Sequence, residues 1–210
     1  MSEVDIFLIG VPKAGTTWLA HTLNQHPGIV LSEPKEPNII ASHKGTFIRS
    51  VESPEWNKFE TCFQGEGLRL DASIHAFSCP LAASRIKERI PDAKFIITMS
   101  DPVKRTYSDY HFLGDDLKPV MQGPPPGNRG RKKDNHHFES STPSTKSAQE
   151  FHDRTVSQIN DMNACIEART NKNGWFRASQ ICAHDRHKFG IGGWGRMSIS
   201  MYILFIEKWL

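Results

Sequence analysis

The feature that most constrains this chain is a short loop between an apolar segment and a segment with helical spacing. The apolar run 6–9 stops at Gly10, and Lys13 lies inside the loop that follows. Gly15 closes the loop, and leucines with helical spacing follow Thr16. A strand, a tight loop and a helix N-terminus bring backbone N–H groups together, and the helix dipole and a lysine add positive charge. The sequence therefore predicts a phosphate site at this junction.

The loop differs from the phosphate loop of ATPases and GTPases. Gly10 and Gly15 keep the spacing of the G-x-x-x-x-G-K-[ST] pattern, but the lysine is Lys13, inside the loop, and Thr16 follows the second glycine. No later apolar strand ends in an aspartate that obviously holds Mg²⁺. An ATPase or GTPase is therefore the weaker interpretation. The alternative without function is a strand, turn and helix with a chance lysine.

Composition limits the classes of protein that remain. The 210 residues fit one domain, with 38% hydrophobic and 23% charged residues, as in a globular protein. A net charge of +3 is too small to indicate a nucleic-acid partner, but it is compatible with a polyanionic substrate. No apolar run approaches the roughly 20 residues of a membrane span. The acidic N-terminus leads directly into a strand, so we expect no signal peptide.

The cysteines and histidines do not indicate a metal site. The four cysteines lack a C-x-x-C pair, so disulfides are permitted but not required. We expect Cys165 and Cys182, which flank a short loop between two late segments, to form a disulfide if the protein matures in an oxidising compartment. The pair His136-His137 and the histidines after Cys182 are expected to be solvated loop residues, because no second ligand pair has matching spacing.

Strands and helices are expected to alternate along most of the chain. Strands are predicted over 5–9, 29–31 and 94–99, and helices over 16–24, 78–90, 101–112, 151–166 and 197–210. Ser78 is the expected N-cap of its helix, and residues 95–97 are expected to form a buried strand. This alternation predicts an α/β fold with three layers, α/β/α, around a central parallel sheet.

Two further regions bear on organisation. The polar turn 32–38 follows the second predicted strand, and ligands in open α/β sheets lie beyond the carboxyl ends of strands. We therefore expect this turn and the phosphate loop to face one crevice. Residues 118–147 are rich in glycine, proline and basic residues, which predicts a mobile insertion. The last predicted helix has no C-cap, so we interpret 1–210 as one domain that is truncated at its C-terminus.

Three segments together resemble the sulfotransferases that use 3′-phosphoadenosine 5′-phosphosulfate (PAPS). The order P-K-x-G-T-T-x-L at 12–19 resembles their 5′-phosphosulfate loop. Residues 26–37 resemble the segment of carbohydrate sulfotransferases that carries the catalytic base, and 101–110 resemble the segment that binds the 3′-phosphate. Residues 107–110 and 151–165 look most like the N-acetylgalactosamine 4-sulfate 6-O-sulfotransferase branch.

The resemblance implies a function and a set of site residues. The protein would transfer a sulfuryl group from PAPS to a hydroxyl of a glycan, glycosaminoglycan-like, without a metal and without a nucleic-acid partner. Lys13 would stabilise the leaving phosphate and Glu36 would act as general base. The residues implied in donor binding are Pro12, Lys13, Ala14, Gly15, Thr16, Thr17, Ser100 and Ser108. The Golgi lumen is the location implied by the family, with the cytoplasm as the alternative.

One position departs from the family pattern. The family usually has an arginine eight residues before the serine of the 3′-phosphate segment, and here that position is Ser100. The loss affects donor affinity rather than the transfer chemistry. Two alternatives therefore stay open: a small-molecule or nucleoside kinase, and a catalytically inactive module that binds the desulfated donor PAP or a glycan.

Overall fold

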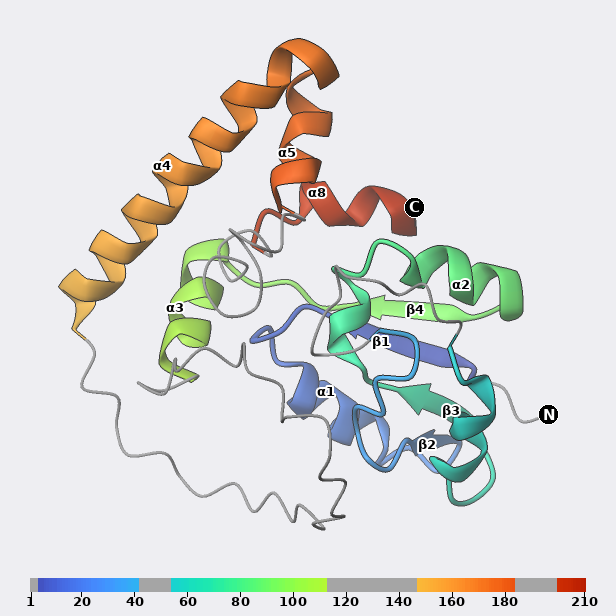
Figure 1. Ribbon diagram of the computed structural model, residues 1–210. Helices are drawn as coiled ribbons and strands as arrows, with labels where there is room; N and C mark the ends of the chain where they lie inside the picture. Colours follow the sequence, from blue (N-terminus) through green and yellow to red (C-terminus); the bar gives the residue numbers. More distant parts are fainter. Residues whose placement is uncertain (1–3, 42–53, 113–146, 184–199) are drawn as a thin grey trace, which may run out of the picture.

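The computed structural model describes residues 4–41, 54–112, 147–183 and 200–210 (Figure 1). Its centre is a four-stranded sheet in the order β2-β3-β1-β4, formed by β1 (Ile6–Gly10), β2 (Ile29–Leu31), β3 (Leu68–Asp71) and β4 (Lys94–Ile97). Every neighbouring pair of these strands is parallel. The predicted central parallel sheet is therefore confirmed, and β3 is an additional strand that the sequence did not reveal.

The central strand β1 is buried on both faces, as expected for a parallel sheet covered by helices. Ile6 and Leu8 pack with Ala20 of α1 (Thr16–Leu23) on one face. Phe7 and Ile9 point to a larger cluster on the other face. Figure 1 shows α1 on one side of the sheet and α2 (Ala82–Arg89) on the other, so the predicted three-layer arrangement is confirmed.

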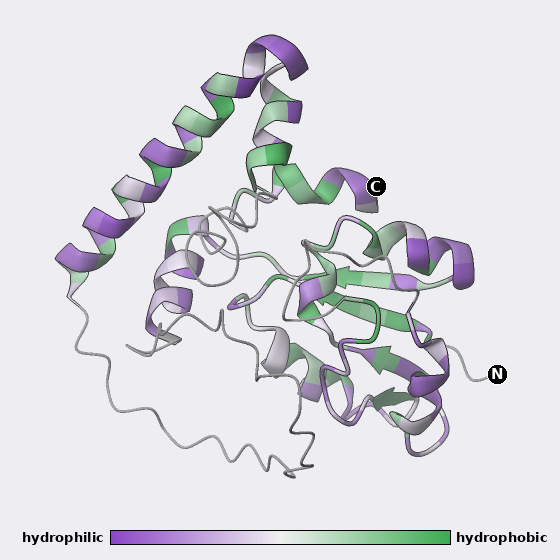
Figure 2. Ribbon diagram, in the orientation of Figure 1, coloured by the Kyte–Doolittle hydropathy of each residue, from purple (hydrophilic) through white to green (hydrophobic). Residues whose placement is uncertain are grey.

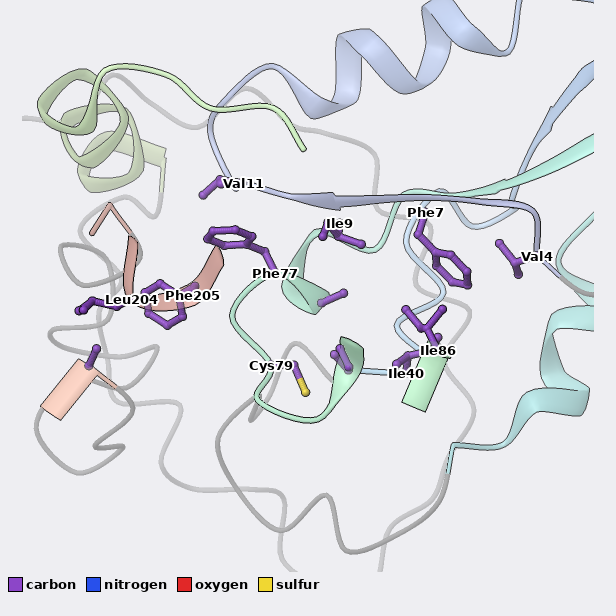
Figure 3. Close-up of a cluster of buried hydrophobic side chains, with 14 of the residues drawn as sticks. Val4, Phe7, Ile9, Val11, Ile40, Phe77, Cys79, Ile86, Leu204 and Phe205 are labelled. Carbon is purple, nitrogen blue, oxygen red and sulfur yellow. The ribbon is translucent and has the colours of Figure 1, made fainter. Parts of the chain in front are cut away.

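The larger cluster is built from segments far apart in the sequence. Phe77 lies at its centre and contacts Phe205 with a ring separation of 5.8 Å, while Ile86 of α2 packs nearby (Figure 3). Short elements complete this layer: the 3₁₀ helices η1 (Trp56–Thr61), η2 (Ile74–Ala76) and η3 (Glu207–Trp209), and the helix α8 (Ile203–Ile206). Helix α8, close to the end of the chain, is therefore part of the core through Leu204 and Phe205.

Three further helices lie beyond the carboxyl edge of the sheet. They are α3 (Pro102–Phe112), α4 (Ala148–Asn173) and α5 (Trp175–Ala183). The Ser147 side chain caps α4, and the expected disulfide between Cys165 and Cys182 joins α4 to α5. Figure 2 shows polar and apolar residues alternating along α4, whose outer surface faces solvent. Among the described helices, none is long and apolar enough to cross a membrane.

The structure corrects three expectations about element boundaries. Ser78 does not cap α2, which starts at Ala82, because the residue before Pro80 avoids the helical conformation. Phe95 is 40% exposed rather than buried, because β4 lies at an edge of the described sheet. The described part of the last predicted helix holds only α8 and η3. Residues 118–146 lie outside the described residues, and so do 197–199.

Candidate active site

The phosphate loop is held to the sheet at its first residues. The Val11 N–H donates to the Thr98 carbonyl at 2.9 Å, and the Thr98 N–H donates to the Gly10 carbonyl at 2.9 Å. Gly10 has a φ of 146°, and a Cβ at this position would lie 2.9 Å from the Phe77 Cβ. Only glycine fits both the conformation and the space, so Gly10 fixes the point where strand becomes loop.

The end of the loop leaves backbone donors available at the start of α1. Gly15 is the N-cap of this helix with a φ of 81°, and no side chain caps it. Within the described part of the chain, the N–H groups of Gly15, Thr16 and Thr17 have no acceptor. Gly15 also has open space beside it, because an added Cβ would meet no atom within 4 Å. These features are the ones expected of an anion site, and the phosphate site stays a prediction.

Lys13 lies in this loop with a φ of 66° and a half-buried side chain. Burial lowers the pKa of its ammonium group, and the carboxylate of Asp109 on α3 opposes that shift. The lysine therefore lies within electrostatic reach of α3. A full charge beside the uncapped helix start adds to its positive potential.

Arg105 braces the loop from α3, a role that the sequence analysis missed. Its side chain is 1% exposed and its Nη1 atom donates to the Pro12 carbonyl at 3.2 Å. The guanidinium also pairs with Asp109 at 3.3 Å and donates to the Ser200 hydroxyl at 2.5 Å. The signal in the sequence was the spacing of Arg105 and Asp109, which puts opposite charges on one helix face.

The turn after β2 presents the predicted base. The Glu36 side chain is 29% exposed, and its Oε1 atom pairs with the Lys35 ammonium at 2.6 Å. The Lys35 carbonyl accepts a hydrogen bond from the Ser32 hydroxyl at 3.0 Å. The carboxylate is thus accessible and oriented by its neighbour.

A buried carboxyl group lies at the end of β3, between that turn and the phosphate loop. Asp71 is 2% exposed, and burial raises its pKa to about 6 against the hydrogen bonds from Ser73, which lower it. Glu36 and Lys35 also act on this group, in opposite directions. The end of β3 therefore lies within electrostatic reach of the Lys35–Glu36 pair.

The two serines predicted to bind the 3′-phosphate lie at the end of β4 and on α3. Ser108 is exposed on α3. The Ser100 hydroxyl is buried and has no partner among the described residues, while its carbonyl accepts from the Tyr202 hydroxyl at 2.9 Å. Ser100 is thus available for hydrogen bonding but less accessible than Ser108.

The strand order explains how these segments come together. All strands are parallel, so the Glu36 turn, Asp71, the phosphate loop and Ser100 all follow the carboxyl ends of their strands. The order β2-β3-β1-β4 puts the loop of Lys13 next to the end of β3, with the Glu36 turn beyond it. The loop and the turn thus share one edge of the sheet, and the predicted common crevice stays a prediction. Among the described residues, no cluster of three or more His, Cys, Asp or Glu side chains has a geometry suited to a metal ion.

The fold and this edge define a parallel α/β protein with an uncapped helix N-terminus and a lysine at the carboxyl edge of its sheet. Comparison with known families is specific: the sulfotransferase domain model matches residues 3–159. The chain therefore belongs to the sulfotransferase domain family. The narrower branch of N-acetylgalactosamine 4-sulfate sulfotransferases is not distinguished by this match.

Two relatives agree with the family. The membrane-associated sulfotransferase kil1 of Dictyostelium discoideum is 32% identical over 118 residues, which cover 54% of this chain and 24% of that protein. The match thus spans about a quarter of the relative's length. The crystal structure of a sulfotransferase from Alicyclobacillus acidocaldarius superposes with a TM-score of 0.50 at 20% identity, covering 91% of this chain and 71% of the other. The second comparison supports the fold.

Proposed function

We propose that this protein transfers a sulfuryl group from PAPS to a hydroxyl group of a glycan. One observation carries the proposal: an uncapped helix start with a half-buried lysine lies at the same sheet edge as the accessible carboxylate of Glu36. The first feature suits the phosphate of a donor, and the second suits a proton acceptor.

The donor half of the reaction needs stabilisation of a leaving group. Sulfuryl transfer in line from PAPS moves an SO₃-like group and leaves negative charge on the 5′-phosphate of PAP. Lys13 and the N–H groups of Gly15, Thr16 and Thr17 would bind that charge as it develops. Arg105 would keep the loop in place through its bond to the Pro12 carbonyl. Preorganised donors of this kind need no rearrangement during the transfer.

The acceptor half needs a base near the attacking hydroxyl. Glu36 would take the proton as the acceptor oxygen bonds to sulfur, and Lys35 would orient the carboxylate through their ion pair. Pro12 and Ala14 would shape the loop around the phosphosulfate. No bound metal is part of this scheme.

The nucleotide end of the donor would lie toward α1 and α3. Ser108 and Ser100 would hydrogen-bond the 3′-phosphate, and neither replaces the charged fork of an arginine. Trp18 on the first turn of α1 is 72% exposed, and a flat aromatic surface is suited to stacking on adenine. The serine at position 100, where the family usually has an arginine, is the observation that favours the second candidate, an inactive module that binds PAP.

The class of glycan acceptor and the cellular location are further parts of the proposal, and they are supported by other observations. The segments 107–110 and 151–165 resemble the N-acetylgalactosamine 4-sulfate 6-O-sulfotransferase branch, which favours a sulfated, glycosaminoglycan-like acceptor. The disulfide between Cys165 and Cys182 favours an oxidising compartment such as the Golgi lumen. The name of the Dictyostelium relative adds an association with membranes.

A transfer assay with ³⁵S-labelled PAPS and a panel of chondroitin, dermatan and heparan acceptors tests the proposal. We expect label in a glycan product, with Glu36→Gln reducing turnover about 10²–10⁴-fold. Thermal shift with PAP and with ATP·Mg²⁺ separates the alternatives. Stabilisation by PAP without transfer to any acceptor would indicate the inactive module, and stabilisation by ATP·Mg²⁺ alone would indicate a kinase.

A further inference from the structure

A chain of hydrogen bonds joins the end of β3 to the turn that carries Glu36. The Oδ1 atom of Asp71 accepts from the Ser73 N–H at 2.8 Å and from the Ser73 hydroxyl at 2.6 Å. The Ser73 hydroxyl oxygen accepts from the Asn38 backbone N–H at 3.0 Å. The Asn38 side-chain amide donates to the Glu36 carbonyl at 2.8 Å. We call these four residues the Asp71–Glu36 relay.

The buried end of the relay is rigid. Asp71 is 2% exposed and Ser73 is 4% exposed, so water does not compete for their hydrogen bonds. The Ser73 hydroxyl has a single proton, which goes to the Asp71 carboxyl group, and its lone pairs remain for Asn38. The direction of each bond in the relay is therefore fixed by chemistry.

The turn itself offers few other attachment points. Pro34 and Pro37 have no N–H, so Asn38 supplies the first backbone donor after Glu36. Asn38 has a φ of 53°, a left-handed conformation that asparagine tolerates better than most residues. The bond from its N–H to Ser73 holds that conformation and with it the exit of the turn.

We propose that Asp71 and Ser73 are positioning residues, which hold the backbone of the Glu36 turn so that its carboxylate can accept the proton of the acceptor hydroxyl. The inference rests on the proposed function, in which Glu36 is the base. A general base works only within hydrogen-bond reach of its proton, and a misplacement of about 1 Å costs about 10²-fold in rate. The Lys35 ion pair orients the side chain, whereas the relay orients the main chain that carries it.

Electrostatics supports the same connection. Glu36 and Lys35 from the turn both act on the pKa of Asp71. Burial raises the pKa of Cys62, which follows η1, and the Asp71 carboxylate adds to that rise. The buried acid thus lies close to the base, to its ion-pair partner and to the segment that packs beside them.

The test compares two buried serines of the same region. Ser73→Ala removes the middle of the relay. Ser78→Ala is the matched control, because Ser78 is 3% exposed and its hydroxyl, among the described residues, donates only to the His75 carbonyl at 3.4 Å. We expect Ser73→Ala to lower kcat about 10²-fold, with the PAP dissociation constant unchanged, and Ser78→Ala to keep both. Asp71→Asn retains an acceptor oxygen for the Ser73 hydroxyl, so the bond between Ser73 and Asn38 should persist in this variant.

Hydrogen exchange of the Asn38 backbone amide tests the hydrogen bonds of the relay without an activity assay. The Asn38 amide should be protected in the wild type, in Ser78→Ala and in Asp71→Asn, and should lose protection in Ser73→Ala. Glu36→Gln is assayed in parallel. Wild-type kcat in Ser73→Ala, while Glu36→Gln is inactive, would overturn the inference and leave the proposed function intact. Wild-type turnover in Glu36→Gln would instead overturn the proposed base, and an unprotected Asn38 amide in the wild type would overturn the relay.

Discussion

Burial acts on two ionisable residues of the site, and in both cases it disfavours the charged form. It lowers the pKa of Lys13 and raises that of Asp71 to about 6. Lys13 has a nearby carboxylate in Asp109, so its charge is partly compensated. A bound phosphate would stabilise the charged form of Lys13 further. Binding of the donor would therefore depend on the charge of this lysine.

The change Lys13→Ala should abolish transfer and weaken PAP binding. The loss of one charged hydrogen bond to a phosphate corresponds to about 1.5–3 kcal/mol, or roughly 10- to 100-fold in affinity. Isothermal titration with PAP measures it. Lys87→Ala, which removes an exposed lysine from α2, is the control for overall charge and should leave the affinity unchanged. Equal affinities in the two variants would contradict the role of Lys13.

Asp71 gives a prediction for stability against pH. Its pKa in the folded protein is raised to about 6, so the folded state binds the extra proton between about pH 4 and pH 6. The contribution of Asp71 to stability is complete below about pH 4 and is lost as pH rises through about 6, a loss of about 3 kcal/mol. Asp71→Asn has no charge to bury. As pH rises from about 4 to about 6, the unfolding free energy of the variant should therefore increase relative to that of the wild type. Urea unfolding at pH 4.5, 6 and 8 measures it, and a constant difference would contradict the raised pKa.

Helix α3 links the loop that contains Lys13 to the C-terminal part of the described chain. Arg105 contacts Pro12 in the loop, Asp109 on its own helix and Ser200 beyond α5. Thr106 adds a bond to Ser200 at 2.8 Å. A single buried guanidinium therefore connects three segments of the chain.

Removing that guanidinium should affect both stability and donor binding. Arg105→Met leaves the Asp109 carboxylate without the buried half of its ion pair, and breaking such a pair costs about 3–5 kcal/mol of unfolding free energy. Arg105→Lys keeps the charge but not the planar guanidinium group. Its unfolding free energy and PAP affinity should therefore lie between those of Arg105→Met and the wild type. Chemical unfolding and PAP titration are the measurements. Wild-type stability and wild-type PAP affinity in Arg105→Lys would show that the charge alone matters.

At the level of elements, strands that end at a glycine or at a polar turn were the easiest to predict. β1 and β2 were located within one residue because apolar runs end at Gly10 and before the polar turn. β3 was missed because Leu68-Arg69-Leu70-Asp71 is short and half polar. Its conformation comes from pairing with β1 on one side and β2 on the other, which is a tertiary effect.

At the level of the whole molecule, the disulfide joins helix α4 to helix α5. Cys165 and Cys182 are 17 residues apart, and closing such a loop contributes about 3 kcal/mol through the unfolded state. Cys165→Ser with Cys182→Ser should lower the unfolding free energy by about that amount. Chemical unfolding of protein from a secretory host measures it, with reduced wild type as the comparison. Mass spectrometry that finds both thiols free in such protein would contradict the pairing.

The sequence predicted the parts of the site that depend on local geometry. Lys13, Gly15 and Glu36 follow strands directly, so the parallel sheet was enough to bring loop and turn to one edge. Arg105 and Asp71 were not assigned roles, because the contacts that suggest those roles join segments that are distant in the chain. Arg105 donates to Ser200, 95 residues later, and Ser73, which bonds to Asp71, accepts from Asn38, 35 residues earlier.

The distance between Arg105 and Ser200 also has a consequence for biosynthesis. A ribosome adds about 5–20 residues per second, so the hydroxyl that anchors the guanidinium appears about 5 to 20 seconds after the arginine itself. During that interval the nascent chain already contains the phosphate loop and the turn with Glu36, but the brace behind the loop is incomplete. The brace behind the loop is therefore completed only after all the strands of the sheet have been synthesised. Leu204 and Phe205 of the core follow Ser200 within a few residues, so the loop and the core both wait for the same late segment of the chain.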